Sequence, residues 1–319
     1  MTSKLYMDQK PLSTMRRFFL LFAFFCALTA RAQIKPDWTT PLPPFQVADD
    51  LYYVGSEELA AYLITTPAGN ILINANLETS PPQIRASVEK LGFHWADTKI
   101  LLNSQAHFDH MAGAAQILRE TGAKNMVMEG DAEVVESGGR TDFLFAIKAV
   151  PPYPPAKADR VLHDDETVEL GGVTLTAHKT AGHTRGCTTW TLPVHLAKDP
   201  AARLRNAVIV GGLGFWSDYH LIEAGDLKAS YPGIAEDFTR TFRDLGSLPC
   251  DIFLGAHGSY FDLKEKLARY EKEGPQVFVD PDGYKEFVGK GREHFETELK
   301  KEQEAAARPL ADGSSRGGR

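Results

Sequence analysis

The feature that most constrains this chain is a set of three histidine-bearing loops, each placed after an apolar run with strand character. His107, Asp109 and His110 follow "TKILLNS", His183 follows "VTLTAHKT", and His257 follows "CDIFLGA". In α/β proteins the chemistry gathers where strand ends meet at one edge of a sheet. We therefore expect the three loops to converge, which requires strands from both halves of the chain to end at a shared edge.

The first half of the chain predicts a β-meander followed by alternating helices and strands. The runs "LYYVG", "AAYLITT" and "GNILINA" each end in turn residues, as the strands of hairpins do. "PPQIRASVEKLGF" and "MAGAAQILRETGA" have apolar residues at helical spacing, and the buried strand "TKILLNS" lies between them. The first histidine cluster is therefore expected in a loop between the carboxyl end of a strand and a helix.

The second half resembles the first in its order of elements. Residues 137–162 are rich in glycine and proline and predict a long surface connection. Strands are then expected in "ETVELGGVTLTAHKT", "TTWTLPV", "NAVIVGG" and "CDIFLGAHGS", and helices in "YPGIAEDFTRTFRDLGSL" and "DLKEKLARYEKEG". With 319 residues, 43% of them hydrophobic, the chain suits one large domain or two tightly fused halves.

Residues 1–32 predict a cleaved signal peptide. Basic residues precede the apolar run "FFLLFAFFCALTA", and the small residues Ala30 and Ala32 form a cleavage site. The 13 residues of this run are fewer than the ~20 that a membrane-spanning helix needs. Phe24 and Phe25 match a lipoprotein site at Cys26 poorly. We therefore expect a periplasmic or secreted protein, with cleavage after Ala32 and no membrane attachment afterwards.

Three segments are predicted: the signal peptide at 1–32, a folded domain at 33–298 and a disordered polar tail at 299–319. Cleavage would remove five basic and one acidic side chain from a chain of net charge −7, leaving −11. So acidic a protein is not expected to bind nucleic acid. Cys187 and Cys250 would remain, which allows at most one disulfide. We expect two buried free thiols.

The histidine loops carry the residue types of a zinc site. Neutral imidazoles and a carboxylate suit Zn²⁺, and a coordination position left open for water makes such a site catalytic. A single histidine in a loop is usually solvated or hydrogen-bonded, but H-x-D-H between a strand and a helix, with two further histidine loops downstream, favours a metal site. Histidines without this context are interpreted as ordinary, namely His163, His178, His195, His220 and His294.

The motif Q-x-H-x-D-H at a strand end, followed by Gly-His and Ala-His loops, resembles the H-x-H-x-D-H pattern of the metallo-β-lactamase superfamily. The segments "DWTTPLPPFQVADDLYYVG", "AAYLITTPAGNILIN", "GHTRGCTTWT" and "FLGAHGSYFDL" are similar to those of subclass B3 metallo-β-lactamases, and the match runs from about Trp38 to Leu267. The resemblance implies an α/β fold of the αββα four-layer sandwich type for residues 33–298. It also implies zinc-dependent hydrolysis of the β-lactam amide bond by a metal-activated hydroxide.

The resemblance implies two metal sites with three ligands each. The first consists of Gln105, His107 and His183. The second consists of Asp109, His110 and His257. Most relatives have histidine at position 105, although some members of the subclass carry glutamine. Because an amide oxygen is a neutral and harder ligand than imidazole, the first site should bind zinc more weakly or lack one ligand. One or two zinc ions are expected.

The resemblance also implies roles in catalysis and in substrate binding. Asp109 is expected to ligate zinc and orient the hydroxide, and Tyr219 to donate to the tetrahedral oxyanion. A simply packed tyrosine is the alternative at position 219. Leu213 and Phe215 occupy the places where relatives often have serines that help to bind substrate. Binding of the small-molecule β-lactam at these positions should therefore differ.

Three other functions remain to be weighed. Another metallo-hydrolase with the same fold, a lactonase or thioesterase, is the main alternative, because a fold does not determine a substrate. A non-catalytic zinc-binding protein would follow if the first site were too degraded. A serine β-lactamase is suggested by S-x-x-K at Ser87–Lys90, but no S-D-N or K-T-G follows, so this match is interpreted as chance.

Overall fold

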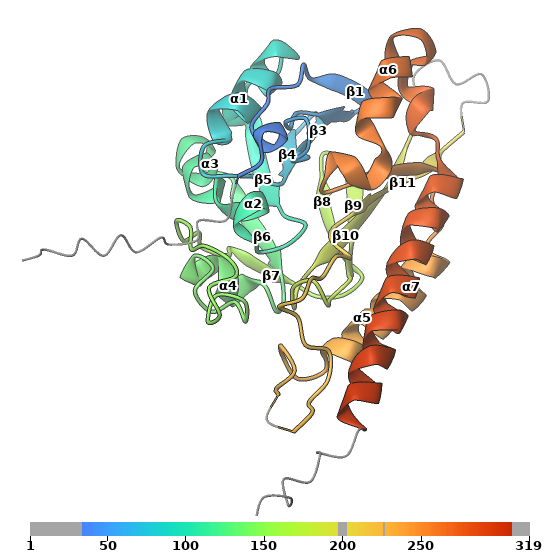
Figure 1. Cartoon of the computed structure of the whole chain (residues 1–319). Coiled ribbons are helices and arrows are strands. Elements are labelled where there is room, and N and C mark those ends of the chain that lie inside the picture. Colours follow the sequence, from blue (N-terminus) through green and yellow to red (C-terminus); the bar gives the residue numbers. More distant parts are fainter. Residues whose placement is uncertain (1–33, 197–202, 226, 308–319) are drawn as a thin grey trace, which may run out of the picture. The chain divides into compact units, whose positions relative to one another are not determined.

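Two β-sheets form the centre of the computed structural model, which describes residues 34–196, 203–225 and 227–307 (Figure 1). The first sheet has its strands in sequence order: β1 (Phe45–Ala48), β2 (Leu51–Tyr53), β3 (Tyr62–Thr66), β4 (Gly69–Ile73), β5 (Thr98–Leu102), β6 (Lys124–Met128) and β7 (Arg160–Leu162). The second has the order β12 (Ile252–Gly255), β11 (Arg205–Val210), β10 (Thr188–Val194), β9 (Val173–Lys179) and β8 (Glu166–Leu170).

The first sheet changes from antiparallel to parallel pairing along its length. Strands β1 to β4 pair antiparallel in succession, which confirms the expected meander. From β4 to β7 each pair is parallel. A parallel connection needs a crossover, so the chain returns through helices between these strands. The carboxyl ends of β4, β5 and β6 consequently lie at one edge, where the first histidine loop begins.

Alternate residues of the first sheet enter two different cores. Leu63, Leu72 and Leu101 on β3, β4 and β5 pack against the outer helices α1 (Pro81–Lys90), α3 (Ala114–Thr121) and α4 (Ala132–Ser137). Their chain neighbours, such as Ile64 and Ile73, instead join the core that contains the second sheet. This period of two is what a strand buried on both faces produces.

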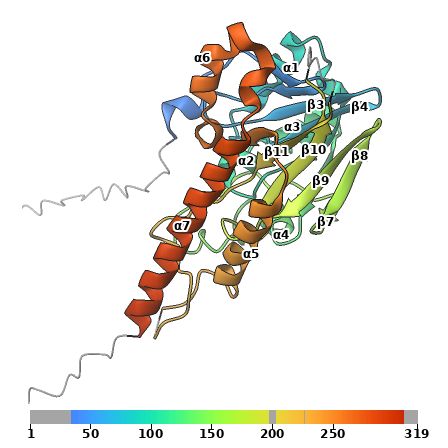
Figure 2. The same ribbon diagram turned by 90° about the vertical axis from the view of Figure 1, so that its right-hand side faces the viewer.

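Helices also cover the second sheet. In Figure 1, α5 (Ile234–Ser247), α6 (Leu263–Glu273) and α7 (Pro281–Ala306) lie on the side away from α1 and α3, and Figure 2 gives the same arrangement from a second direction. Side chains of α5 and α7, among them Phe238, Phe242 and Phe295, belong to the core of that sheet. The expected αββα four-layer sandwich is therefore confirmed.

The longest helix among the described residues, α7, is not one of the elements expected from the sequence. Pro281 occupies its first turn, where proline is tolerated, and Asp280 caps it by accepting a hydrogen bond from the backbone N–H of Gly283 at 2.9 Å. The helix runs to Ala306, so the expected start of a disordered tail at residue 299 is wrong. Near its end, Glu302 accepts hydrogen bonds from the backbone of residues 221 and 222 at 2.8 and 3.1 Å, which fixes this part of the helix.

Other sequence-based expectations are corrected, confirmed or left outside the described residues. The connection after α4 contains no helix before β7, yet Leu144 and Tyr153 within it are buried, so it is not simply a surface segment.

Cys187 and Cys250 are both free; the first is buried as expected, whereas the second is only half-buried. Residues 1–32 and 308–319 lie outside the described part. Within that part, no helix combines the length and apolar character needed to cross a membrane.

Candidate metal centre

The first histidine cluster lies where β5 meets a short helix. Backbone N–H and hydroxyl groups of Ser104 donate to the Asn74 side chain at 2.8 and 3.0 Å, which fixes the chain just beyond the strand. His107 is the N-cap residue of α2 (Phe108–Met111). Asp109 and His110 are therefore helical, and the expectation that the whole cluster forms a loop is corrected. The helix turns both side chains toward the same centre.

The other two histidines arrive from the second sheet. His183 lies between β9 and β10, directly after Gly182, whose φ of +136° and closeness to the Phe238 ring suit glycine alone. His257 follows β12 and precedes the short 3₁₀ helix η3 (Gly258–Phe261). The carboxyl end of β12 and the β9–β10 loop thus bring their imidazoles to the edge where β5 ends.

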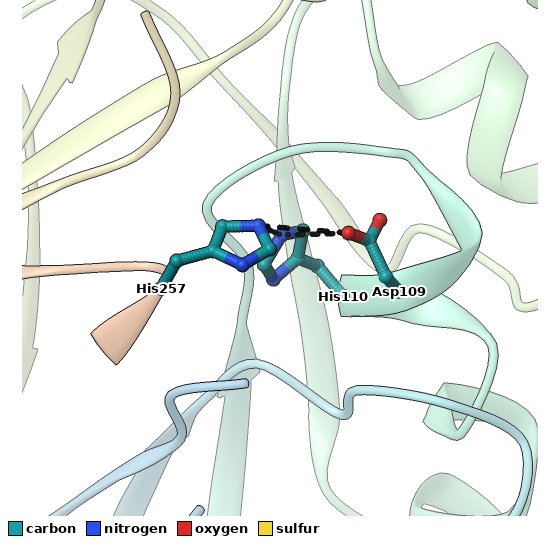
Figure 3. Close-up of side chains that lie close together, drawn as sticks. All are labelled: Asp109, His110 and His257. Carbon is teal, nitrogen blue, oxygen red and sulfur yellow. Dashed lines mark hydrogen bonds and ion pairs between the residues drawn. The ribbon is translucent and has the colours of Figure 1, made fainter. Parts of the chain in front are cut away.

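Asp109, His110 and His257 form a compact group (Figure 3). The Nε2 atoms of His110 and His257 are 3.1 Å apart, and Oδ2 of Asp109 lies 3.5 and 3.6 Å from them, respectively. A tetrahedral zinc ion with ligands at 2.0–2.2 Å holds neighbouring donor atoms about 3.3–3.6 Å apart. These three side chains are therefore spaced as the ligands of one metal ion, which they could hold.

A second pair of imidazoles lies in the same pocket. Nδ1 of His107 is 3.1 Å from Nε2 of His183, so two ring nitrogens again face each other, slightly closer together than two ligands of one zinc ion. Gln105, two residues before His107, is 1% exposed, and its amide oxygen Oε1 has no hydrogen-bond partner. A buried oxygen without a partner is costly, and a metal ion would satisfy it. The donor set therefore fits a second cation.

The distal nitrogens of His183 and His257 have partners that sequence reasoning missed, and a buried carboxylate lies near that of His107. Nδ1 of His183 hydrogen-bonds the carbonyl oxygen of Gly214. Nδ1 of His257 lies 3.4 Å from Oε1 of Glu58, and Nε2 of His107 lies 3.7 Å from Oδ2 of the buried Asp142. Such partners orient the rings of metal-binding histidines. No local motif marked them, because they come from distant parts of the chain.

Burial sets the protonation of the centre. It lowers the pKa of His107 to about 4 and that of His110 and His183 to about 3, so these imidazoles are neutral at pH 7. Burial alone would raise the pKa of Asp109, but the surrounding histidines, above all His110 and His257, hold it below its usual value. Neutral imidazoles beside an ionised carboxylate are the protonation states that zinc binding requires.

The centre opens into a pocket of about 440 Å³. Its walls include four aromatic side chains around the histidines, namely Trp38, Phe108, Trp216 and Tyr260, together with the carboxylates of Glu58 and Asp109. Among the described residues that line the pocket, Lys35 is the only lysine or arginine. The arrangement therefore offers apolar surface for a small molecule and a single cationic side chain near the metal ligands.

Tyr219, Leu213 and Phe215 do not occupy the places expected of them. The Tyr219 ring is buried beside His183, and its hydroxyl donates to the His183 carbonyl oxygen at 2.7 Å, so it positions this histidine rather than facing the pocket. Leu213 is 4% exposed in the core, and Phe215 stacks on His294 of α7. Because side chains alternate in direction along an extended segment, Gly214 and Trp216 line the pocket instead.

The lowered pKa values predict how the stability of the metal-free protein depends on pH. In the unfolded chain each histidine gains a proton near its ordinary pKa of 6.5, whereas in the folded protein His107, His110 and His183 do so only at about 3–4. Their contribution to stability is therefore complete above pH 6.5 and is lost as the pH falls toward 3. Asp131 acts in the opposite direction, because burial raises its pKa to about 7.

Asp142, whose pKa burial also raises, opposes the histidines too. Three imidazoles outweigh two carboxyl groups, so we expect the free energy of unfolding of the metal-free protein to be lower at pH 5 than at pH 7. The slope is about 1.4 kcal/mol per pH unit for each proton that the unfolded chain binds in excess. Urea unfolding at the two pH values measures the difference. Equal stability at both would mean that these histidines are not buried in neutral form.

Comparison with known proteins adds three findings. A sequence model of the metallo-beta-lactamase superfamily matches residues 60–195. The native FEZ-1 metallo-beta-lactamase from Legionella gormanii is 48% identical with a TM-score of 0.78, over 83% of this chain and 98% of that one. The class B3 di-zinc metallo-beta-lactamase LRA-12 from an Alaskan soil metagenome is 35% identical with a TM-score of 0.74, over 84% and 99% of the two chains.

A curated relative from Burkholderia pseudomallei (strain 1710b) carries the description "Probable metallo-hydrolase". It is 29% identical over 175 residues, which make up 53% of this chain and 54% of the relative. The chain thus spans about half the length of that relative, whereas its alignments with the solved structures extend over nearly all of theirs.

Proposed function

Because this chain belongs to the metallo-β-lactamase superfamily of hydrolases, we propose that it hydrolyses the β-lactam amide bond of antibiotics. The observation that carries the proposal is the convergence of two facing imidazole pairs with the Asp109 carboxylate in one aromatic-walled pocket. The two structural relatives named above are β-lactamases, and one of them is described as a di-zinc enzyme. Zinc, as one or two ions, is the proposed cofactor.

The proposed ligands divide into two subsites. The first subsite comprises Gln105, His107 and His183; the second subsite comprises Asp109, His110 and His257. A bound zinc ion would supply Lewis acidity and lower the pKa of a coordinated water toward ~7. The protein's part is to keep the imidazoles neutral and the ligand atoms at zinc-binding separations.

Asp109 has the central catalytic role in this proposal. Its carboxylate is 8% exposed, and its pKa is held low by the neighbouring histidines, so it remains an acceptor at neutral pH. It would accept a hydrogen bond from the attacking water and turn the water's lone pair toward the substrate carbonyl. The expected role of Tyr219 as oxyanion donor is not part of the proposal, since its hydroxyl proton is bonded to the His183 carbonyl.

The pocket offers a substrate one cationic side chain, the carboxylates of Glu58 and Asp109, and apolar surfaces. Lys35 could pair with the carboxylate that β-lactam antibiotics carry. An acyl-homoserine lactone has no carboxylate to use this lysine. The Trp38 and Trp216 rings offer surfaces for the apolar substituents of the substrate. We further propose that the protein is exported to the periplasm or the medium, with its signal peptide removed after Ala32.

The proposal is tested with purified, zinc-loaded protein. We expect kcat/KM for a carbapenem to exceed that for an acyl-homoserine lactone and for a simple thioester by at least about a hundredfold, a difference of about 2.7 kcal/mol in transition-state binding. A faster reaction with the lactone or the thioester would assign the centre to a different hydrolase. Absence of turnover with all three substrates at full metal loading would favour a non-catalytic zinc protein.

The glutamine in the first subsite makes a separate prediction. Gln105→His replaces a neutral amide oxygen with imidazole, a better zinc ligand, so we expect the affinity of the weaker metal to rise about tenfold or more. Calorimetric titration of the metal-free protein with Zn²⁺ measures the change. Gln83→His is the matched control, since Gln83 lies on α1 and also has a buried amide atom without a partner. Identical titrations of wild type and Gln105→His would place Gln105 outside the metal site.

A further inference from the structure

A buried carboxylate connects the first two histidine loops through groups that are not metal ligands. Asp131 is 0% exposed and lies at the start of α4. Its Oδ2 atom accepts hydrogen bonds from the backbone N–H of Ala106 and the hydroxyl of Thr184, each at 2.8 Å. Its Oδ1 atom accepts one from the backbone N–H of Gly186, also at 2.8 Å. One side chain therefore holds segments that are about 80 residues apart in the chain.

The backbone around Asp131 and the backbone after His183 pack so closely that two positions admit only glycine. A Cβ atom on Gly186 would lie 2.5 Å from the backbone nitrogen of Asp131. A Cβ atom on Gly130, whose φ is +91°, would lie 2.6 Å from the carbonyl oxygen of Arg185. Both separations are too short for any side chain. The turn that contains Asp131 therefore packs directly against the loop that contains His183.

The residue whose backbone N–H is bound by Asp131 lies between two proposed ligands. Ala106 lies between Gln105 and His107. Its N–H donates to Asp131, and its carbonyl oxygen accepts a 2.5 Å hydrogen bond from the hydroxyl of Tyr153. Both polar groups of this residue are therefore fixed, which limits the rotation of the backbone on either side of it.

The second subsite has a separate anchor. The carbonyl oxygen of His110 accepts hydrogen bonds from the backbone N–H groups of Ala75 and Asn76 at 2.9 and 3.1 Å. The Nδ1 atom of His257 lies beside Glu58, which comes from the segment between β2 and β3 of the first sheet. Glu58 also accepts a hydrogen bond from the Ser259 hydroxyl at 2.6 Å. None of these contacts involves Asp131.

We propose that Asp131 is a positioning residue that aligns Gln105 and His107 with His183 and so determines the metal affinity of the first subsite but not of the second. The inference rests on the proposed function insofar as it assumes two metal subsites. Groups that orient metal ligands typically contribute 10- to 100-fold to metal affinity. The effect should be large at this subsite, because its glutamine ligand is weak and depends on exact placement.

Asp131→Asn is the main test variant. The amide keeps the size of the carboxylate, but its NH₂ group must face either the Ala106 N–H or the Gly186 N–H, where a donor meets a donor. Thr184→Val is a milder variant that removes one of the three hydrogen bonds and keeps the side-chain shape. It gives a result even if Asp131→Asn fails to fold.

The full-length metal-free chain is titrated with Zn²⁺ by calorimetry and with Co²⁺ by absorption of its ligand-field bands. We expect two binding steps in the wild type. In Asp131→Asn the weaker step should lose about 10- to 100-fold in affinity, and in Thr184→Val somewhat less, while the tighter step changes less than about twofold. A general loss of structure would weaken both steps, so the selectivity distinguishes positioning from a merely structural role.

Two matched variants control for the substitutions themselves. Asp159→Asn alters an aspartate that accepts a backbone N–H from Asn125 away from the pocket. Thr98→Val alters a buried threonine at the start of β5 whose hydroxyl has no partner. Both should titrate like the wild type.

Equal changes of both steps in Asp131→Asn and Thr184→Val would overturn the inference, and so would an unchanged weaker step in these variants. A wild type with a single binding step would also overturn it, since there would be no first-subsite metal to position. The titrations contain no substrate. Failure to hydrolyse β-lactams would therefore refute the proposed function, while the two binding steps would still decide the role of Asp131.

Discussion

Replacement of Asp109 by alanine is expected to reduce β-lactam hydrolysis at least about a thousandfold while the fold stays intact. The carboxylate lies 3.5 and 3.6 Å from the facing nitrogens of His110 and His257, so its loss removes both a proposed metal ligand and the acceptor that orients the attacking water. Removal of a single group that acts in the transition state typically costs about 10²–10³ in kcat, and loss of a ligand adds to this. Steady-state kinetics at saturating zinc measures the effect.

The fold should survive this substitution because Asp109 lies in the pocket wall, and its charge is stabilised chiefly by the histidines rather than by core packing. Circular dichroism and thermal unfolding of Asp109→Ala check this point. Asp159→Ala, a change of the same kind outside the pocket, is the control and should keep wild-type turnover. Near-normal hydrolysis by folded Asp109→Ala would refute the assigned centre.

Removal of metal is expected to abolish hydrolysis, and addition of Zn²⁺ to restore it. The groups that converge at the proposed site are imidazoles spaced as zinc ligands and the Asp109 carboxylate. Cys187 is not an alternative nucleophile, because burial raises the pKa of its thiol to about 12. Dialysis against a chelator, metal analysis and assay of the same samples test the expectation.

Zinc should also raise the unfolding temperature of the metal-free protein. A ligand that binds only the folded state stabilises it by about 2.7 kcal/mol at a free concentration of about 100 times Kd. This measurement needs no substrate, so it reports on the metal centre independently of the reaction. Hydrolysis that persists in demonstrably metal-free protein would instead support a chemistry based on an amino-acid nucleophile.

Sequence reasoning succeeded where the signal is local. The meander before Ile73, the β5 strand and the helix after Gly113 each follow from periodicity and turn residues within a short window. Five of the six proposed ligands stand out because His107, Asp109 and His110 share one short motif and because His183 and His257 follow strand-like runs with glycine beside them. The sixth, Gln105, follows from the family resemblance alone. The resemblance to one superfamily then supplied the sandwich that brings the loops together.

The sequence did not predict side-chain orientations that depend on contacts with residues distant in the chain. By register, Leu213 and Phe215 were expected at the substrate, but the backbone turns them into the core and toward α7, and presents Gly214 and Trp216 to the pocket instead. Tyr219 lies close to the centre, but its hydroxyl donates a hydrogen bond to the carbonyl oxygen of His183 and does not face the pocket. A shift of one residue along an extended segment reverses the side on which every side chain lies.

A local reading of the chain is enough to identify residues that can bind a metal and the strands and helices that carry them, because ligand chemistry and hydrophobic periodicity are properties of neighbouring residues. The folded protein was needed to show which nitrogen of each histidine faces its partner, and that the carboxylates of Glu58, Asp131 and Asp142 lie close to the centre. These contacts join residues from separate strands and loops. Their formation depends on how the two sheets pack, which no short stretch of the chain encodes.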